Sequence, residues 1–117
     1  MEELIRIFEV LGDETRLRIM KILLERDTLC VCEIMQALRI NQTRVSKHLR
    51  ILKDAGLVKS KKKGLWVYYS INKNSSKNMK EILLFLKQML NEDGILIKDK
   101  KRLAKAVKLS ECKCKIV

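Results

Sequence analysis

The stretch "LRINQTRVSKHLRILKDAGLVKSKKK", residues 38–63, gives the clearest indication of the fold. Asn41 is a good N-cap, and the residues after it repeat at helical spacing until Gly56, which is suited to end a helix. After Gly56 the period changes from 3.6 to 2, which predicts two strands around a turn near Gly64. The apolar positions expected to face inward from the helix are Val45, Leu49 and Leu52.

Helices are also expected on the N-terminal side of this stretch. The spacing of apolar residues predicts helices over 2–11 and 14–25, and Asp13 is placed to cap the second. A third, short helix is expected to open at Cys30, where Glu33 is placed to reach back to unpaired backbone N–H groups. A tight turn then leads to Asn41 and the next helix.

The order helix, helix, short helix, tight turn, helix and basic hairpin predicts a winged helix-turn-helix, which is mainly α with a small β-hairpin. Helical spacing returns over residues 75–91. With 117 residues, the chain is long enough for one domain with an extension. We expect residues 1–92 to form a DNA-binding and dimerisation domain, and residues 93–117 a basic C-terminal extension that carries a cysteine pair.

Positive charge is concentrated in the same stretch. The chain has a net charge of +12, and residues 39–63 contain nine Lys or Arg against one acidic residue. Such a block favours a polyanion partner, and the absence of interleaved aromatic residues favours double-stranded DNA over RNA. The alternative is a solvated lysine-rich surface. The candidate DNA-binding residues are Gln42, Thr43, Arg44, Ser46, Lys47, His48, Arg50, Lys61, Lys62 and Lys63.

Several classes of protein are disfavoured. No apolar run is long enough to span a bilayer, so no membrane partner is expected, and the acidic start "MEELIRIFEV" does not resemble a signal peptide. A cytoplasmic location is therefore expected, where thiols stay reduced. An enzyme of the thioredoxin kind would need a βαβ pattern, which is not seen.

Two pairs of cysteines, each spaced i, i+2, suggest chemistry at sulfur. Cys30 and Cys32 stand at the expected start of a helix, where the macrodipole and nearby basic residues favour thiolate, a ligand for soft ions. In a regular helix these two residues would point to different sides, so gripping one ion requires local distortion. Cys112 and Cys114 would share one side of an extended tail. The alternatives are small buried hydrophobes for the first pair and incidental residues for the second.

Four motifs in this order resemble the ArsR/SmtB family of metal-sensing repressors. They are "GDETRLRIMKILL" (12–24), "LCVCEI" (29–34), "QTRVSKHLRILKDAGLV" (42–58) and "GLWVYYSI" (64–71). The resemblance implies a winged-helix homodimer that represses operons for metal efflux or detoxification and leaves its operator DNA when the metal binds.

The resemblance also indicates an inducer. In the arsenite-responsive branch a third cysteine follows the pair, whereas this chain has Met35 there. The expected inducer is As(III) or Sb(III), with the missing sulfur coming from the tail. A Cd(II)- or Pb(II)-responsive repressor and a thiol redox-switched DNA-binding regulator stay open as alternatives. The candidate metal-binding residues are Cys30, Cys32, Cys112 and Cys114.

The apolar faces of the first and fifth helical segments are too extensive for the core of one small chain. We therefore assign part of them to a dimer interface, as the resemblance also implies. The candidate interface residues are Leu4, Ile7, Phe8, Met79, Ile82, Leu83, Leu86, Met89 and Leu90.

Overall fold

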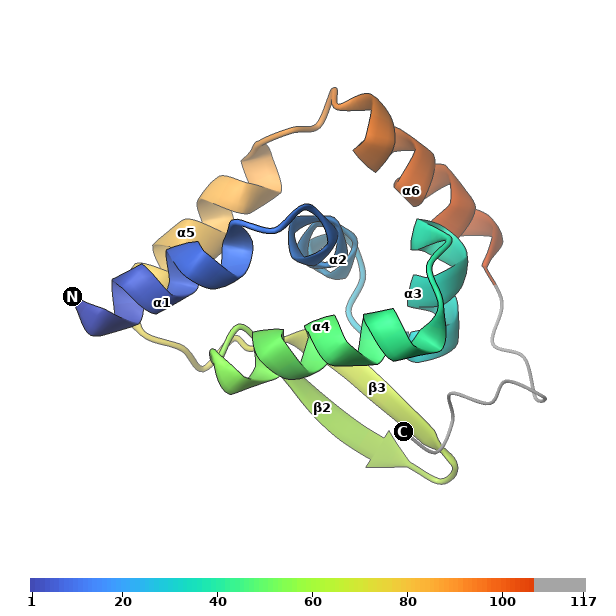
Figure 1. Ribbon diagram of the computed structural model, residues 1–117, viewed down its shortest axis with the longest axis horizontal. Coiled ribbons are helices and arrows are strands. Elements are labelled where there is room, and N and C mark those ends of the chain that lie inside the picture. Colours follow the sequence, from blue (N-terminus) through green and yellow to red (C-terminus); the bar gives the residue numbers. More distant parts are fainter. Residues whose placement is uncertain (107–117) are drawn as a thin grey trace.

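The computed structural model describes residues 1–106, and within them six helices and three strands (Figure 1). Their order confirms the expected winged helix-turn-helix, mainly α with a hairpin. The elements are α1 (Glu2–Leu11), α2 (Glu14–Glu25), β1 (Leu29–Cys30), α3 (Val31–Leu38), α4 (Gln42–Asp54), β2 (Val58–Lys63), β3 (Trp66–Ile71), α5 (Lys77–Gln88) and α6 (Gly94–Lys105).

Side-chain caps begin the helices where the sequence predicts them. Asp13 accepts a hydrogen bond from the Arg16 N–H at 3.0 Å, and Asn41 accepts one from the Arg44 N–H at 2.9 Å. Each cap satisfies a backbone donor that has no partner inside the helix, which is typically worth about 1 kcal/mol. Gly56, with φ of +80°, follows the last turn of α4 in the left-handed conformation that lets the chain turn into β2.

The core forms around α2, which lies between α1, α4 and the other helices in Figure 1. Ile19 and Leu23 of α2 are buried together with the inward face of α4. That face consists of Val45, Leu49 and Leu52, each 0% exposed, as the apolar spacing predicts. The opposite face of α4 is thereby turned to solvent.

The three strands form an antiparallel sheet in the order β1-β3-β2. Strand β2 pairs with β3 from Val58↔Ile71 to Lys63↔Trp66. Strand β1 does not appear among the expected elements, because a two-residue strand leaves no periodic signal. It pairs Cys30 with Tyr68 and so joins the start of α3 to the hairpin.

Helix α6 belongs to the segment predicted as an extension, and it packs against α3 and α2. Asp99 of α6 is fully buried and forms ion pairs with Arg18 and Arg102. Within residues 1–106, no helix is long and apolar enough to cross a membrane.

Candidate nucleic-acid interface and thiol pair

The outer face of α4 presents hydrogen-bond donors to solvent. Thr43, Arg44, Lys47 and Arg50 are exposed, and Gln42 is half-buried. Because the inward residues of α4 lie in the core, these side chains project away from it into solvent. A helix with such donors at its N-terminal half has the chemistry needed for base edges and phosphates in a major groove.

Two predicted members of this set lie elsewhere. The His48 ring is 13% exposed, with Nδ1 3.2 Å from Arg16 Nη1 and 3.9 Å from the Asp13 carboxylate. Burial lowers the pKa of His48, and the neighbouring Arg16 acts in the same direction while Asp13 opposes it. The Ser46 hydroxyl is buried. Two candidate DNA-binding residues of α4 therefore do not lie on its outer face: His48 faces the start of α2, and the Ser46 hydroxyl faces inward.

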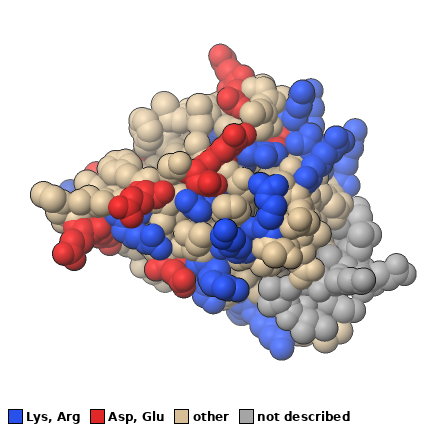
Figure 2. All heavy atoms as spheres, in the orientation of Figure 1, with Lys and Arg blue, Asp and Glu red and all other residues tan. Residues whose placement is uncertain are grey.

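Basic side chains continue from α4 onto the hairpin. Figure 2 shows acidic side chains over α1 and near the upper edge, whereas Lys and Arg spread over α4, toward the hairpin and over α6. Lys61, Lys62 and Lys63 are exposed at the end of β2. They lie on both faces of the hairpin, because neighbouring residues of a strand alternate.

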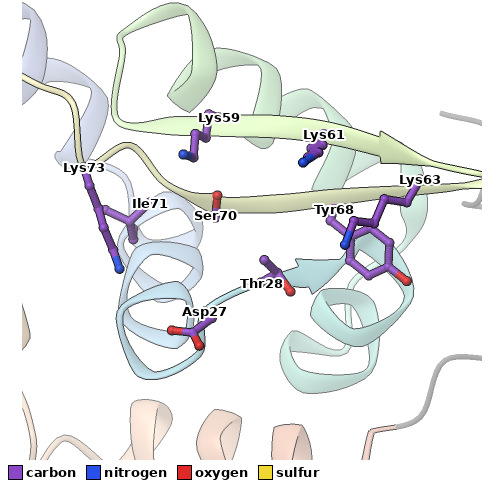
Figure 3. A pocket seen from close by; sticks show the side chains of 9 residues that line it. All are labelled: Asp27, Thr28, Lys59, Lys61, Lys63, Tyr68, Ser70, Ile71 and Lys73. Atoms are coloured by element: carbon purple, nitrogen blue, oxygen red, sulfur yellow. The ribbon is translucent and has the colours of Figure 1, made fainter.

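A hollow of about 580 Å³ lies on the hairpin face that carries Lys59, Lys61 and Lys63, with Tyr68 and Ser70 on the paired strand (Figure 3). Ser60, on the other face, accepts a hydrogen bond from Lys53 of α4 at 2.8 Å. The lysines of the hollow therefore lie on the side of the sheet away from α4. They are surface lysines, and they add positive potential to the whole hairpin.

The thiol pair lies where strand β1 becomes helix α3. Cys30 is the N-cap, with extended backbone angles (φ −88°, ψ 164°), and Cys32 is the second residue of the helix. The geometry expected of a regular helix therefore does not apply to Cys30. The Cys30 N–H donates to Glu33 Oε1 at 3.0 Å, which confirms the predicted role of Glu33, and the Cys30 side chain accepts from the Glu33 N–H in return. Two sulfurs consequently flank the first turn of α3.

The surroundings of Cys30 differ from the expectation. Its thiol is free and 1% exposed, and Cys32 is 3% exposed. Burial raises the pKa of Cys30, and the Glu33 carboxylate beside it adds to the rise. Arg39, one of the basic residues that the sequence places near the pair, lies at the opposite end of α3 and does not offset this rise. Burial therefore disfavours the thiolate form of Cys30, and an ion that binds this sulfur must displace its proton.

No group of three His, Cys, Asp or Glu side chains within residues 1–106 is arranged to hold a metal ion. The other predicted ligands, Cys112 and Cys114, lie outside the described residues. Cys30 supplies one free thiol in the part of the chain that the structure covers, whereas Cys32 is disulfide-bonded. Both can act as soft donors to a thiophilic ion only once that disulfide is reduced.

The predicted dimer-interface residues separate into two groups. Ile7, Met79 and Leu83 are buried in the core of one chain, so their assignment to an interface with a second chain needs correction, whereas Leu86 is buried but lines a surface groove. Phe8, Met89 and Leu90 are exposed, and Leu4 and Ile82 are half-buried. On α1 and α5, sequence reasoning missed three further exposed apolar residues, which the helical pattern did not distinguish from core: Ile5, Leu84 and Phe85.

Two of these exposed apolar residues, Phe8 and Phe85, border a groove between α1 and α5. The groove has a volume of about 620 Å³. Phe8 of α1 and Phe85 of α5, 60% and 59% exposed, are its most prominent apolar side chains. Exposed aromatic residues that line a groove indicate a protein contact more strongly than scattered surface hydrophobes do.

Comparison with known proteins agrees with this geometry. Residues 13–60 match the family model described as bacterial regulatory protein, arsR family. An HTH-type transcriptional regulator of Methanocaldococcus jannaschii is 47% identical over 60% of this chain and 79% of its own length. The arsenical resistance operon repressor of Escherichia coli is 43% identical over 58% of this chain and 58% of its own length.

A cadmium resistance regulatory protein of Staphylococcus aureus is 36% identical over 65% of this chain and 63% of its own length. The chain thus spans less than two thirds of these two bacterial relatives. Among solved structures, reduced HlyU from Vibrio cholerae matches with a TM-score of 0.66 and 28% identity, over 77% of this chain and 90% of the other. The similarity reaches from the helix-turn-helix into the flanking helices.

Proposed function

Because this chain belongs to the ArsR family of DNA-binding transcriptional regulators, we propose that it is a cytoplasmic homodimeric repressor released from its operator by arsenite or antimonite. The observation that carries the proposal is the position of Cys30 and Cys32, at the first turn of the helix that precedes α4. Related repressors of arsenical and cadmium resistance support an inducing ion that binds sulfur.

In the proposed complex, α4 lies in the major groove of double-stranded operator DNA. Arg44, Lys47 and Arg50 face the duplex, and Gln42 and Thr43 lie at the end of the helix that reads bases in helix-turn-helix proteins. Lys61, Lys62 and Lys63 contact the adjacent phosphate backbone. Ser46 and His48 act from within, by packing α4 against the rest of the domain.

Release follows from the cost of bringing two sulfurs onto one ion. Cys30 must lose its proton and leave its reciprocal hydrogen bonds with Glu33, which unwinds the start of α3. Because α3 packs against α4, that change disturbs the recognition helix. By linkage, an ion that favours the distorted form weakens DNA binding as much as DNA weakens ion binding, typically about 5- to 150-fold. Cys112 or Cys114 supplies the remaining sulfur.

A mobility-shift titration tests the proposal, using a duplex that the protein itself selects from a random-sequence pool. Arsenite and antimonite should release this duplex at the lowest concentrations, with a fall in affinity of about 5- to 150-fold. Zinc should release little, because the chain has one His and it packs against Arg16. Sodium nitrate controls for the counter-ion of the metal salts. Arsenate, which lacks the lone pair of arsenite, controls for the oxidation state of arsenic.

The same titration decides between the alternatives. Release by cadmium or lead at lower concentrations than by arsenite would favour a cadmium- or lead-responsive repressor. Release by mild oxidation without any added ion, reversed by a thiol reductant, would favour a redox switch. A protein that stays bound under all these conditions would contradict an inducer role for the thiols.

Dimerisation rests on the groove between α1 and α5. We propose that a second copy of this chain covers Phe8 and Phe85, since both are exposed on one chain and line the same groove. Two recognition helices would then reach half-sites about one helical turn apart, as dimeric helix-turn-helix proteins require.

Phe85→Glu should convert the dimer to monomer, because it places a charge in the apolar contact. Leu84→Glu is a matched control: Leu84 is also 59% exposed but does not line the groove. Sedimentation equilibrium measures the mass of each. A Phe85→Glu protein that remains a dimer while Leu84→Glu dissociates would place the interface elsewhere.

A further inference from the structure

The charged cluster between α6, α2 and α3 carries an inference about DNA recognition. Asp99 of α6 is 0% exposed, and both of its oxygens are used. Arg18 of α2 binds them in bidentate fashion, with Nε–Oδ2 and Nη2–Oδ1 distances of 2.8 Å. Arg102, one turn further along α6, donates to Oδ1 at 2.8 Å.

The two arginines also bind the end of α3. Arg18 Nη2 donates to the Leu38 carbonyl at 3.0 Å, and Arg102 Nε donates to the Ala37 carbonyl at 2.7 Å. These carbonyls belong to the last turn of α3, where no intrahelical N–H is available. The cluster therefore acts as a C-terminal cap for α3 that is supplied by two other helices.

The turn between α3 and α4 makes this cap relevant to function. Only three residues separate Leu38 from the start of α4, and the first of them, Arg39, has left-handed backbone angles (φ 55°, ψ 45°). A residue other than glycine holds such a conformation only where its surroundings impose it. The direction in which α4 leaves α3 is therefore determined at a turn whose preceding carbonyls are held by Arg18 and Arg102.

We propose that Asp99, Arg18 and Arg102 are positioning residues for the recognition helix, so that α6 is required for sequence-specific DNA binding. The inference rests on the proposed function, in which α4 reads the operator. Asp99 itself touches no DNA; it orients two arginines, which in turn fix the end of α3. A buried ion cluster is often worth little to stability but sets one arrangement over others, which is the role assigned here.

Asp99→Asn distinguishes an effect on the position of α4 from an effect of the protein's net charge on DNA binding. The change keeps the shape of the side chain and removes one negative charge, which by itself would strengthen binding to any DNA. Loss of the charge-assisted hydrogen bonds should nevertheless weaken binding to the selected operator duplex by about tenfold, because the two arginines are then held less firmly against the end of α3. Affinity for a scrambled duplex of equal length should stay unchanged or rise.

Arg102→Gln provides the second variant, since its side chain is 24% exposed and its replacement leaves the buried core filled. Lys100→Gln is the matched control on the same helix. It also removes one positive charge, and its ion pair with Glu25, at 3.4 Å, lies on the surface. Arg102→Gln should lower the operator-to-scrambled affinity ratio, whereas Lys100→Gln should weaken both duplexes alike.

The readout is this affinity ratio, measured by fluorescence anisotropy on proteins whose circular dichroism and dimer mass match the wild type. A role in stability alone would lower the melting temperature and leave the ratio unchanged. If Asp99→Asn does not fold, Arg102→Gln decides the question. A folded variant that keeps the wild-type ratio overturns the positioning role. A wild-type protein that selects no sequence overturns the proposed function, and this inference with it.

Discussion

Cys30→Ser, Cys32→Ser and the double variant should bind operator within about twofold of wild type and fail to respond to arsenite, losing a release of about 5- to 150-fold. Serine removes the soft donor but preserves the start of α3, because serine is among the preferred N-cap residues and can replace the Cys30 sulfur in the reciprocal bond with Glu33. The loss of response would therefore reflect lost coordination. Mobility shift with and without arsenite measures it.

Two controls sharpen this experiment. Met35→Leu removes the thioether at the position where the arsenite-responsive branch has a third cysteine, and it should leave release unchanged. Cys112→Ser and Cys114→Ser, made singly and together, test the tail. An unchanged arsenite response in the tail double variant would remove both residues from the ligand set, and normal release by the Cys30 and Cys32 double variant would place the inducer site elsewhere.

Arg44→Ala combined with Lys47→Ala should give the largest loss of operator affinity, about 100-fold at moderate salt, since each specific contact is worth about 1–3 kcal/mol. Both side chains are exposed on the outer face of α4, so their removal should not unfold the protein. Anisotropy at several salt concentrations distinguishes their roles. Loss of a phosphate contact should reduce the salt dependence of binding by about one unit of slope, whereas loss of a base contact should relax the sequence preference.

The matched control, Lys77→Ala combined with Lys80→Ala, also removes two positive charges, but from α5, where both residues are exposed. This control should lose affinity only modestly, through the general field of the protein. Equal losses in the two double variants would mean that overall charge, and not the outer face of α4, provides DNA binding.

Local patterns in the sequence were sufficient to predict most of the fold. The caps at Asp13 and Asn41 are short-range interactions, and the inward face of α4 follows directly from helical periodicity. The change from period 3.6 to 2 after Gly56 located the hairpin. Each of these features depends on residues within one or two turns of each other, which is why a single sequence reveals them.

Features that depend on distant residues were missed or misjudged. The raised pKa of Cys30 follows from burial that only the packed fold creates, whereas the sequence pattern indicated a helix terminus that favours thiolate. The contact of Arg18 with Asp99 joins residues 81 positions apart. Lys21, buried in α2, donates to the Leu86 and Met89 carbonyls at the end of α5, and burial lowers its pKa. Amino-acid composition alone gave no sign that the charged groups of Arg18, Asp99 and Lys21 make these buried contacts.

Cys30 belongs to two structures at once, since its backbone pairs with Tyr68 of β3 and its side chain caps α3. Cys30 therefore connects the basic hairpin directly to α3, the helix that packs against α4. If an ion binds Cys30 as proposed, it would shift the hairpin and the start of α3 together. One binding event would then change the position of both elements that are proposed to contact DNA.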